Sequence, residues 1–457
     1  MENVKINLPM PVQFILNKLH NNGHEAYVVG GCVRDKIMGK MPHDWDICTN
    51  ALPEQIIEVF KDQKVLPTGI QHGTVSIVFD DAPKPFNIFE VTTYRVDGEY
   101  KDNRHPEKVE FVSNLKDDLS RRDFTINAMA YNEREGLIDL FGGTQDIENK
   151  VIRCVGNPTE RFNEDALRIM RALRFSIRFG FKIDEATFNA AKENVNLLKN
   201  VSIERICAET TKVFEKSLYE IFPYNEAKWR MKTLNPMYSF LLEIISIVLP
   251  DEMYSTDHSI MKRMWHLNSP HLEVNLAIAF DVPNYIDILK HLRFSNEIID
   301  AINDIHIYGH QIAEDYPKWI SFEGEIKNVR ADTYYARKLL HNIKKCPTFL
   351  VTDFAKSIII EDNNTFVDKK NYFSQPIYEV SAEILEHTFC ECRNNQDVFE
   401  LKYLAIDGND LKALGYQGRE IGKILNGLLD LVMQDKVKNT YEDLTVAIGQ
   451  VIDYVQL

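Results

Sequence analysis

The chain has 457 residues, of which 44% are hydrophobic and 26% charged, a composition typical of globular proteins and not of disordered ones. At about 100–200 residues per domain, this length predicts about three or four domains. The formal net charge of −15 argues against broad, nonspecific nucleic-acid binding. A local basic groove is still compatible with it, because residues 150–180 carry seven basic and three acidic side chains.

Two further features bear on where the protein acts. No stretch approaches the ~20 uninterrupted apolar residues that span a bilayer, and the N-terminal segment has charges within its apolar run, so we expect neither a membrane segment nor a secretory leader. The cysteines are odd in number and none is in a CxxC pair, which favours a reducing cytoplasm over a disulfide framework or a structural zinc site. They are Cys32, Cys48, Cys154, Cys207, Cys346, Cys390 and Cys392.

The first ~150 residues alternate strand-like and helix-like patterns, and from Asn149 onward the pattern is almost wholly helical. We therefore predict an α+β fold. The expected strands lie at 26–31, 43–49, 72–80 and 86–95, with helices within 1–23 and at 51–60. The expected domains are a first domain with a small sheet and helices, 1–150, and three helical domains, 151–210, 211–390 and 391–457.

Paired glycines end the first expected strand. Gly30 and Gly31 allow the backbone to approach a phosphate closely, and the amides at the start of the following helix favour an anion. Arg34, one turn further on, could donate charge-assisted hydrogen bonds to the same anion. The alternative explanation for the pair is tight packing of a turn.

Three acids of the first domain form a candidate cation site. Asp44 and Asp46 flank Trp45 in an expected strand, so alternation places both carboxylates on one face and Trp45 with Ile47 on the other. Mg²⁺ prefers a few carboxylates plus substrate phosphates, which suits this pair. Glu90, a lone acid in an apolar strand, would complete a two-metal site for in-line phosphoryl transfer. The alternatives are turn or surface acids for the pair and an edge-strand acid for Glu90.

Arginines recur at every third position after Asp165, as Arg168, Arg171 and Arg174. At about 100° per residue they stay within an arc of about 120°, opposite an apolar face. Asn163 is the expected N-cap, which would place Asp165 in the first turn of the same helix. A solvated basic face with helical ion pairs is the alternative explanation.

The pair of Asp165 and Arg168 could select nucleobases. A carboxylate only accepts hydrogen bonds and a guanidinium only donates them. Cytosine and adenine present an amino donor beside a ring-nitrogen acceptor, whereas guanine and uracil present these groups in the reverse order. The pair would therefore match C or A, and it would leave polar groups unpaired against G or U, which discriminates strongly.

In order and spacing, these residues and four downstream segments resemble the motifs of class II tRNA nucleotidyltransferases, the bacterial-type CCA-adding enzymes, in the superfamily around polymerase β. The segments are RRDFTINA (121–128), DLFGG (139–143), RFNEDALRIMRALRF (161–175) and SIERI (202–206) with Glu209. The motif-bearing match covers about residues 25–210. A weaker match at 404–425 is similar to the tail of Firmicutes-like members.

The resemblance implies a polymerase-β-like nucleotidyltransferase head (1–150), a nucleotide-selecting neck (151–210), a helical body (211–390) and a tRNA-binding tail (391–457). It implies that the enzyme adds C, C and A to the 3′ end of immature tRNA from CTP and ATP without a nucleic-acid template. Asp44 and Asp46, helped by Glu90, would hold Mg²⁺. The expected nucleotide-binding residues are Gly30, Gly31 and Arg34 for the triphosphate, Asp165 and Arg168 for the base, Arg171 and Arg174 for sugar and phosphates, and Arg122.

Two other regions carry expectations from the resemblance. Members that add the terminal A have a loop such as residues 93–106, for which an ordinary surface loop is the alternative. The only His–Asp pair in this sequence is His43-Asp44, so we expect the body to be a scaffold without phosphohydrolase activity. The sequence indicates no membrane and no obligate protein partner.

The nearest alternatives are an enzyme that adds only the terminal A, or a bacterial poly(A) polymerase of the same superfamily. The charge of −15 and the tail favour the CCA-adding enzyme over the polymerase. A catalytically inactive RNA-binding homologue is a third alternative, against which the intact Asp44 and Asp46 argue.

Overall fold

A computed structural model describes residues 5–67, 69–80, 87–97, 109–215, 236–237, 239–249, 271–322, 329–331, 333–355, 375–394 and 397–455. The chain divides into two compact units. The first comprises Met1–Val213 with Leu218–Tyr254, and the second comprises Phe214–Ser217 with Ser255–Leu457. Most of the expected loop at 93–106 lies outside the described residues.

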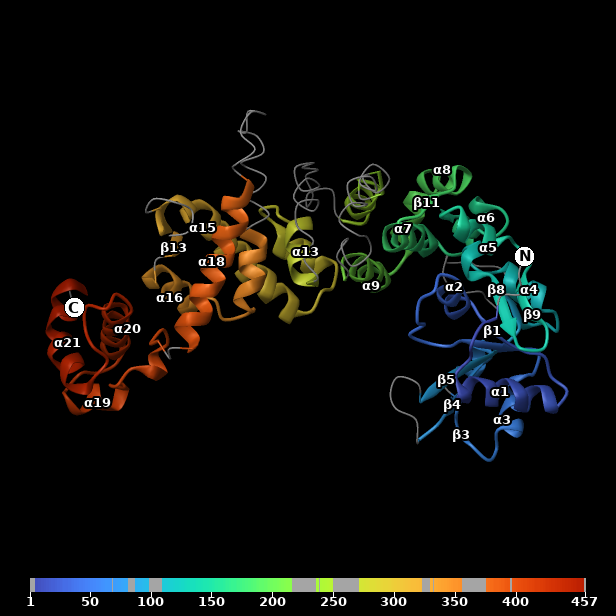
Figure 1. Cartoon of the computed structure of the whole chain (residues 1–457), viewed down its shortest axis with the longest axis horizontal. Helices are drawn as coiled ribbons and strands as arrows, with labels where there is room; N and C mark the ends of the chain where they lie inside the picture. The colour runs from blue at the N-terminus through green and yellow to red at the C-terminus, as the bar shows by residue number, and fades with distance from the viewer. Residues whose placement is uncertain are drawn as a thin grey trace. The chain divides into compact units, whose positions relative to one another are not determined.

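In the described part of the first unit, seven strands form one mixed sheet in the order β3-β4-β5-β2-β1-β8-β9 (Figure 1). β2 and β5 are parallel, and the other neighbouring pairs are antiparallel. The strands are β1 (Ala26–Val29), β2 (Ile47–Thr49), β3 (Lys64–Leu66), β4 (Thr74–Val78), β5 (Ile88–Thr93), β8 (Met129–Asn132) and β9 (Gly136–Asp139). A separate antiparallel ribbon pairs β6 (Arg95–Asp97) with β7 (Val109–Phe111).

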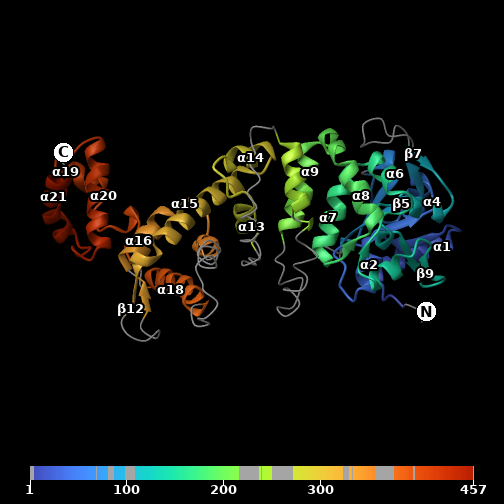
Figure 2. The same cartoon turned by 90° about the horizontal axis from the view of Figure 1, so that it is seen from above.

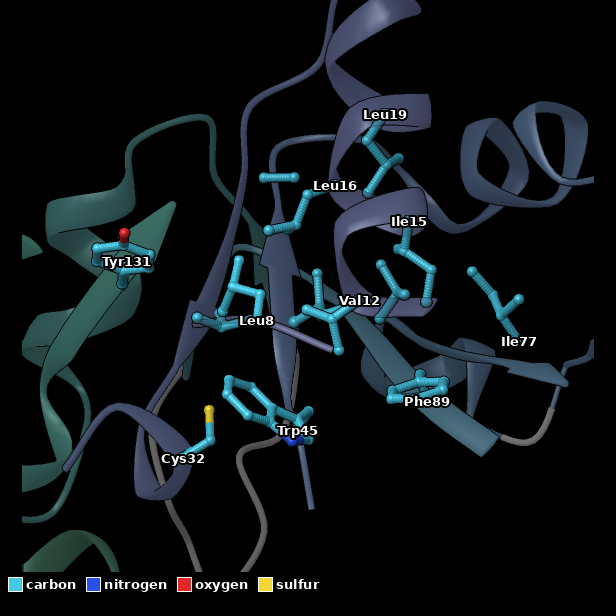
Figure 3. Close-up of a cluster of buried hydrophobic side chains, with 14 of the residues drawn as sticks. Leu8, Val12, Ile15, Leu16, Leu19, Cys32, Trp45, Ile77, Phe89 and Tyr131 are labelled. Carbon is cyan, nitrogen blue, oxygen red and sulfur yellow. The ribbon is translucent and has the colours of Figure 1, made fainter. Parts of the chain in front are cut away.

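Helices cover both faces of this sheet. Apolar residues of α1 (Met10–Asn21) and α3 (Pro53–Val59) pack with Ala26, Val28 and Trp45 in one buried cluster, part of which Figure 3 shows. On the opposite face, α4 (Leu115–Ser120) packs against Tyr27 and Val29. The alternation of β1 side chains between two cores explains why its run is continuously apolar.

The expected helices within 1–23 and at 51–60 are confirmed, as are the strands at 72–80 and 86–95. Helices dominate after residue 149, but two short parallel strands, β10 (Val151–Ile152) and β11 (Lys182–Ile183), interrupt them. The remaining elements up to residue 215 are α2 (Gly31–Ile37), η1 (Ile70–His72), η2 (Thr125–Asn127), α5 (Gly143–Glu148), α6 (Pro158–Glu164), α7 (Leu167–Phe179), α8 (Glu185–Glu193), η3 (Val195–Asn200) and α9 (Ile203–Phe214).

The described part of the second unit is mainly helical. Its elements are α13 (Leu272–Ala279), α14 (Tyr285–His291), α15 (Asn296–Trp319), β12 (Ile320–Phe322), β13 (Val329–Ala331), α16 (Thr333–Asn342), α18 (Gln375–Asn394), η5 (Leu401–Tyr403), α19 (Gly408–Ala413), α20 (Arg419–Met433) and α21 (Tyr441–Val455). α19, α20 and α21 lie together at the C-terminal end of the chain (Figure 2). They pack around a common apolar core that includes Leu411, Leu428 and Ile448.

The predicted α+β class is confirmed, with the sheet in the first unit and helices predominant after it. α9 and α18 run through positions 210 and 390, so the expected domain boundaries there fall within helices. Among the described residues, no helix is long and apolar enough to cross a membrane.

Candidate active site

Asp44 and Asp46 lie in the irregular segment directly before β2. The expected strand at 43–49 is therefore shorter than predicted, because regular pairing begins only at Ile47. The alternation nevertheless holds: Asp44 and Asp46 are exposed, whereas Trp45 and Ile47 are buried. The backbone oxygen of Asp46 accepts a hydrogen bond from Val29 N at 3.0 Å, which keeps this segment beside the end of β1.

Glu90 lies level with Asp46 on the neighbouring parallel strand. In the register of β2 and β5, Ile47 is opposite Val91, so the preceding residues, Asp46 and Glu90, fall in one row. Glu90 is exposed between the buried Phe89 and Val91. β5 lies between β4 and β2, so the explanation of Glu90 as an edge-strand acid is wrong.

The electrostatics of this row favour a cation. The pKa of Asp46 is raised to about 6, first by partial desolvation in its cleft and then by the negative charge of Asp44, with a smaller contribution from Glu90. Arg122 acts in the opposite direction. Within the described residues, the structure brings together no group of three His, Cys, Asp or Glu side chains that could hold a metal by themselves. Hard carboxylate oxygens that await further ligands from a substrate fit a divalent ion of the magnesium type.

Gly30 lies at the end of β1, under the side chain of Arg122. Its φ of 82° is in the region that favours glycine, and a Cβ added there would be 2.9 Å from Arg122 Nη1. Gly31 starts α2 and would have only ordinary contacts with Arg34. Close packing under Arg122 therefore explains Gly30 directly, and it brings a guanidinium to the same turn.

The arginines of the RRDFTINA segment are held by a carboxylate from α4. Asp118 is fully buried and accepts hydrogen bonds from Arg121 Nη2 at 2.7 Å and from Arg122 Nη2 at 3.2 Å. Burial would raise the pKa of Asp118, but the positive charges of Arg122 and Arg121 outweigh it and the pKa is lowered. Asp118 thereby fixes both guanidinium groups in place.

Arg34 is buried between α2 and α7. Its guanidinium donates to Asn127 Oδ1 at 2.5 Å and to Asp35 Oδ1 at 2.7 and 2.8 Å. It also lies over the rings of Phe175 and Phe179, at 5.3 and 4.8 Å from their centroids. These contacts connect the glycine turn to the arginine-bearing helix.

The structure corrects the start of the arginine helix. α6 ends at Glu164, Asp165 has an extended backbone (φ −140°, ψ 102°), and α7 begins at Leu167. Asn163 is therefore not the N-cap; it lies inside α6 and donates to Thr159 O. Asp165 breaks the helix because its Oδ1 accepts a hydrogen bond from Leu167 N at 3.1 Å, a local bond that competes with helix continuation.

Hydrogen bonds from other residues fix the side chains of Asp165 and Arg168. Arg205 of α9 donates to Asp165 Oδ2 at 2.8 Å. Arg168 Nη1 donates to Glu164 Oε2 at 2.5 Å, and its Nη2 donates to the backbone oxygen of Arg121 at 2.9 Å. Other residues thus orient both expected base-selecting side chains, and the backbone N–H of Arg168 donates to the backbone oxygen of Asp165 at 3.0 Å.

Arg171 and Arg174 both form ion pairs with carboxylates; Arg174 is buried, whereas Arg171 is partly exposed. Arg171 donates to Asp123 Oδ2 at 2.7 and 2.9 Å, and Arg174 Nε lies 3.1 Å from Glu209 Oε2. Desolvation lowers the pKa of Arg174 to about 10 although Glu209 opposes it. The alternative explanation of a solvated basic face does not hold for Arg174, which is 6% exposed.

Several residues that orient the site were not predicted as such: Glu164, Asp118, Asp123, Arg205 and Glu209. Asp118 stands three and four positions before Arg121 and Arg122, and that spacing was a readable sign of ion pairs. Arg205 and Glu209 are one helical turn apart on α9, but the partner of Arg205 is Asp165, between α6 and α7, and the partner of Glu209 is Arg174 on α7. No local pattern in the sequence could have identified those partners.

Sequence comparison assigns the first part of the chain to a known class. Residues 26–153 match the family model of the poly A polymerase head domain. Residues 180–220 match a model described as the probable RNA and SrmB-binding site of polymerase A. The sheet, its row of acids and these matches define a nucleotidyltransferase.

Relatives over most of the chain are CCA-adding enzymes. One from Ligilactobacillus salivarius (strain UCC118) is 39% identical over 314 residues, 64% of this chain and 76% of the relative. Another, from Streptococcus suis (strain 05ZYH33), is 35% identical over 374 residues, 79% of this chain and 85% of the relative. The crystal structure of the Bacillus stearothermophilus CCA-adding enzyme in complex with CTP aligns over 99% of both chains, with a TM-score of 0.70 and 25% identity. The chain belongs to the family of CCA-adding enzymes, the class II tRNA nucleotidyltransferases.

Proposed function

We propose that this chain completes tRNA 3′ ends with C, C and A from CTP and ATP, and that the row formed by Asp46 and Glu90, with Asp44, is its catalytic centre. Family membership over most of the chain supports the reaction, and it favours CCA addition over addition of A alone and over poly(A) synthesis. The row of acids on two parallel strands is the observation that carries the assignment of the centre. The likeness to a CTP-bound CCA-adding enzyme supports CTP as a substrate.

Asp44 and Asp46 hold divalent ions, of which Mg²⁺ is the best match to carboxylate oxygens that share an ion with substrate phosphates. When bound, such ions activate the primer 3′-hydroxyl and neutralise the pyrophosphate that leaves. Glu90 contributes a further negative charge on the side of the attacking hydroxyl. The raised pKa of Asp46 supports this assignment, because a cation relieves the repulsion among these acids.

The chain's own groups bind and orient the nucleotide. The turn at Gly30 and Gly31 and the guanidinium of Arg122 above it receive the triphosphate, with Arg34 behind the turn. Asp165 accepts from the amino group of cytosine or adenine, and Arg168 donates to the adjacent ring nitrogen. Each carboxylate oxygen has a second lone pair, so the bonds of Asp165 to Arg205 and Leu167 leave it able to accept from a base.

Arg171 and Arg174 contribute positive charge toward the sugar and phosphates from the same helix, while their ion pairs with Asp123 and Glu209 fix α7. The head (1–150) carries the chemistry and the neck (151–210) selects the base. The body (211–390) is a scaffold, and the tail (391–457) binds tRNA. The seven cysteines, all within described residues and all free thiols, fit a cytoplasmic enzyme.

An extension assay tests the function. A tRNA lacking CCA is supplied with CTP, with ATP, and with both. We expect two C residues with CTP alone and CCA with both. Long runs of A from ATP would select a poly(A) polymerase, and activity only on tRNA that already ends in CC would select an A-adding enzyme. An enzyme inactive with Mg²⁺ that still binds tRNA would be a catalytically inactive homologue.

A further inference from the structure

Asn127 in η2 bonds two groups of opposite charge. Its carbonyl oxygen accepts a hydrogen bond from Arg34 Nη1 at 2.5 Å, and its amide nitrogen donates to Asp123 Oδ1 at 3.0 Å. A guanidinium only donates and an ionised carboxylate only accepts, so these partners determine the orientation of the amide. Asn127 is buried, and water therefore does not readily replace either bond. An aspartate of the same shape would lose the bond to Asp123, and a leucine would lose both.

On one side, Asn127 contacts the glycine turn. A Cβ added at Gly30 would be 3.8 Å from the backbone oxygen of Asn127, and a Cβ added at Gly31 would be 3.5 Å from Arg34 Nη2. Arg34 is buried and also donates to Asp35, so its guanidinium is held in place. The backbone of Asn127 and the partner of its side chain thus both lie next to the turn that we assign to the triphosphate.

On the other side, Asn127 is connected to α7 through Asp123. Oδ1 of Asp123 accepts from Asn127 and from Phe124 N at 2.8 Å, and its Oδ2 accepts from Arg171 Nε and Nη2 at 2.9 and 2.7 Å. Together these bonds use the lone pairs that the two oxygens of a carboxylate offer. The position of Asp123, and with it the position of α7 at Arg171, therefore depends on Asn127.

An aromatic side chain of α7 closes this connection. The guanidinium carbon atoms of Arg34 and Arg171 both lie 5.3 Å from the centroid of the Phe175 ring, which is within the range of cation–π interactions. Connected hydrogen bonds strengthen and restrain one another, so a change at one member should affect the others. The closed network joins α2, η2 and α7 and consists of Arg34, Asn127, Asp123, Arg171 and Phe175.

We infer that Asn127 is a positioning residue for the nucleotide, because its amide sets the separation between the site of the triphosphate at Gly30 and the site of the base on α7. This inference rests on the proposed function, which assigns those two sites. A nucleotide has a fixed reach, so both of its ends bind at once only if the two sites are held at the matching separation. Contacts to the base then also help to align the reacting phosphate, since binding energy from a remote part of a substrate is used for orientation.

The test removes the amide donor without changing the shape of the side chain. Asn127→Asp keeps an acceptor for Arg34 but places a second carboxylate against Asp123. The matched control is Asn132→Asp, because Asn132 is also buried and its amide donates to the backbone oxygen of Ala26 at 3.2 Å. Asn132 ends β8 beside the start of β1, at the opposite end of that strand from the glycine turn. The full-length proteins are compared in steady-state incorporation on tRNA lacking CCA.

We expect Asn127→Asp to raise the KM for CTP about tenfold to a hundredfold, the effect of losing a hydrogen bond to a charged group. The KM for UTP should rise less, because a base that Asp165 and Arg168 do not match gains little from the correct separation of the two sites. The preference for CTP over UTP in kcat/KM should therefore fall about tenfold. The KM for tRNA should stay at the wild-type value. Asn132→Asp should lower the urea midpoint without changing the KM for CTP or the preference.

A double change tests the pairing itself. In Asp123→Asn with Asn127→Asp the amide and the carboxylate exchange places, so one donor again faces one acceptor. The KM for CTP of this double variant should be lower than the product of the two single effects predicts, because both residues act through one bond. Multiplicative effects would overturn the inference. A wild-type KM for CTP in folded Asn127→Asp, or an equal rise for UTP, would also overturn it.

Circular dichroism at the assay temperature shows whether each variant is folded. If Asn127→Asp is unfolded, the double variant must be folded and must keep the preference for CTP over UTP within about tenfold of wild type, or the inference fails. A wild-type enzyme that adds no C to tRNA lacking CCA would contradict the proposed function. Normal addition by the wild type together with multiplicative effects would contradict only the role of Asn127.

Discussion

Asp46 and Asp123 are both aspartates of the first unit, yet their pKa values move in opposite directions. The pKa of Asp46 is raised to about 6 by desolvation and by Asp44, and that of Asp123 is lowered to about 2. Burial alone would raise the pKa of Asp123, but Arg171 and the amide of Asn127 outweigh it. The difference lies in the neighbouring charges. Asp46 belongs to the acidic row with Asp44 and Glu90, which carry the same charge, whereas Asp123 belongs to the arginine region around α7, where Arg171 carries the opposite charge.

This difference separates two kinds of functional region. Among the described residues, Asp44, Asp46 and Glu90 make no side-chain hydrogen bond or ion pair; the charge of Arg122 offsets the repulsion at Asp46 only in part, and a bound cation would balance the three acids. Arg168, Arg171 and Arg174 of α7 already have carboxylate partners, so the region that selects the base is preorganised. Four predictions test this contrast, from the largest expected effect to the smallest.

Replacing Asp46 should have the largest effect. Asp46→Ala should reduce nucleotide incorporation by about a thousandfold or more, because metal-ion stabilisation of a phosphoryl-transfer transition state contributes several kcal/mol. Binding of tRNA should stay within about twofold, measured by filter binding, since RNA duplexes are contacted mainly through their backbones. Glu133→Ala, which removes an exposed acid of the same unit, is the control. If Asp46→Ala had normal activity, the proposal that this row of acids is the catalytic centre would be wrong.

In the arginine region the largest effect should be on stability. Glu209→Gln takes a charged partner from the buried Arg174, and breaking a buried pair in this way costs about 3 kcal/mol or more. Urea denaturation measures the loss. The double change Arg174→Met with Glu209→Leu should recover much of it, because no buried charge is left unpaired. A stable Glu209→Gln protein would show that this pair does not hold α7 to α9.

Changing Asp165 should alter selectivity more than stability. Asp165→Asn replaces one acceptor oxygen with an amide donor and weakens the bond from Arg205, so it should lower the preference for CTP over UTP by about a hundredfold in kcat/KM. Single-turnover incorporation with each nucleotide measures the ratio. Glu160→Gln, an exposed acid on α6, should keep the wild-type preference. An unchanged ratio in Asp165→Asn would move base selection to another residue.

Acid should distinguish the two aspartates. The folded-state pKa of Asp123, about 2, lies below its ordinary value near 3.8, so its stabilisation is complete above pH ~4 and is lost as the pH falls through about 2. A difference of nearly two pKa units corresponds to about 2 kcal/mol of unfolding free energy. Asp123→Asn should lack this acid dependence in urea midpoints measured between pH 5 and 2.5.

The ionisation of Asp46 affects the free energy of unfolding in the opposite direction. Its folded-state pKa, about 6, is above the ordinary value, so its ionisation disfavours the metal-free fold as the pH rises from about 4 to about 6. Asp46→Asn should therefore still lose stability at low pH, because Asp123 is unchanged. It should no longer show the decrease in stability that the ionisation of Asp46 causes between pH about 4 and about 6. The same acid dependence in both variants would contradict the contrast between the two regions.

Much of the candidate site was predictable because it depends on local patterns. Alternation placed Asp44 and Asp46 on one face, with Trp45 on the other, and apolar periodicity predicted α1 and α3. The start of α7 was predicted wrongly, because Asn163 and Asp165 are both good capping residues by type. Which of them ends α6 depends on Leu167 N and on Arg205, and Arg205 is 40 positions further along the chain.

The sequence by itself determined the α+β class, the family and the residue types of the catalytic row, since these follow from periodicity and from motifs with fixed spacing. Only the tertiary structure decided which charges balance which. The register of β2 with β5 aligns Glu90 with Asp46, and the fold brings Arg205 to Asp165 and Glu209 to Arg174. These contacts join positions far apart in the chain, and their energies depend on burial and distance, which a linear pattern does not contain.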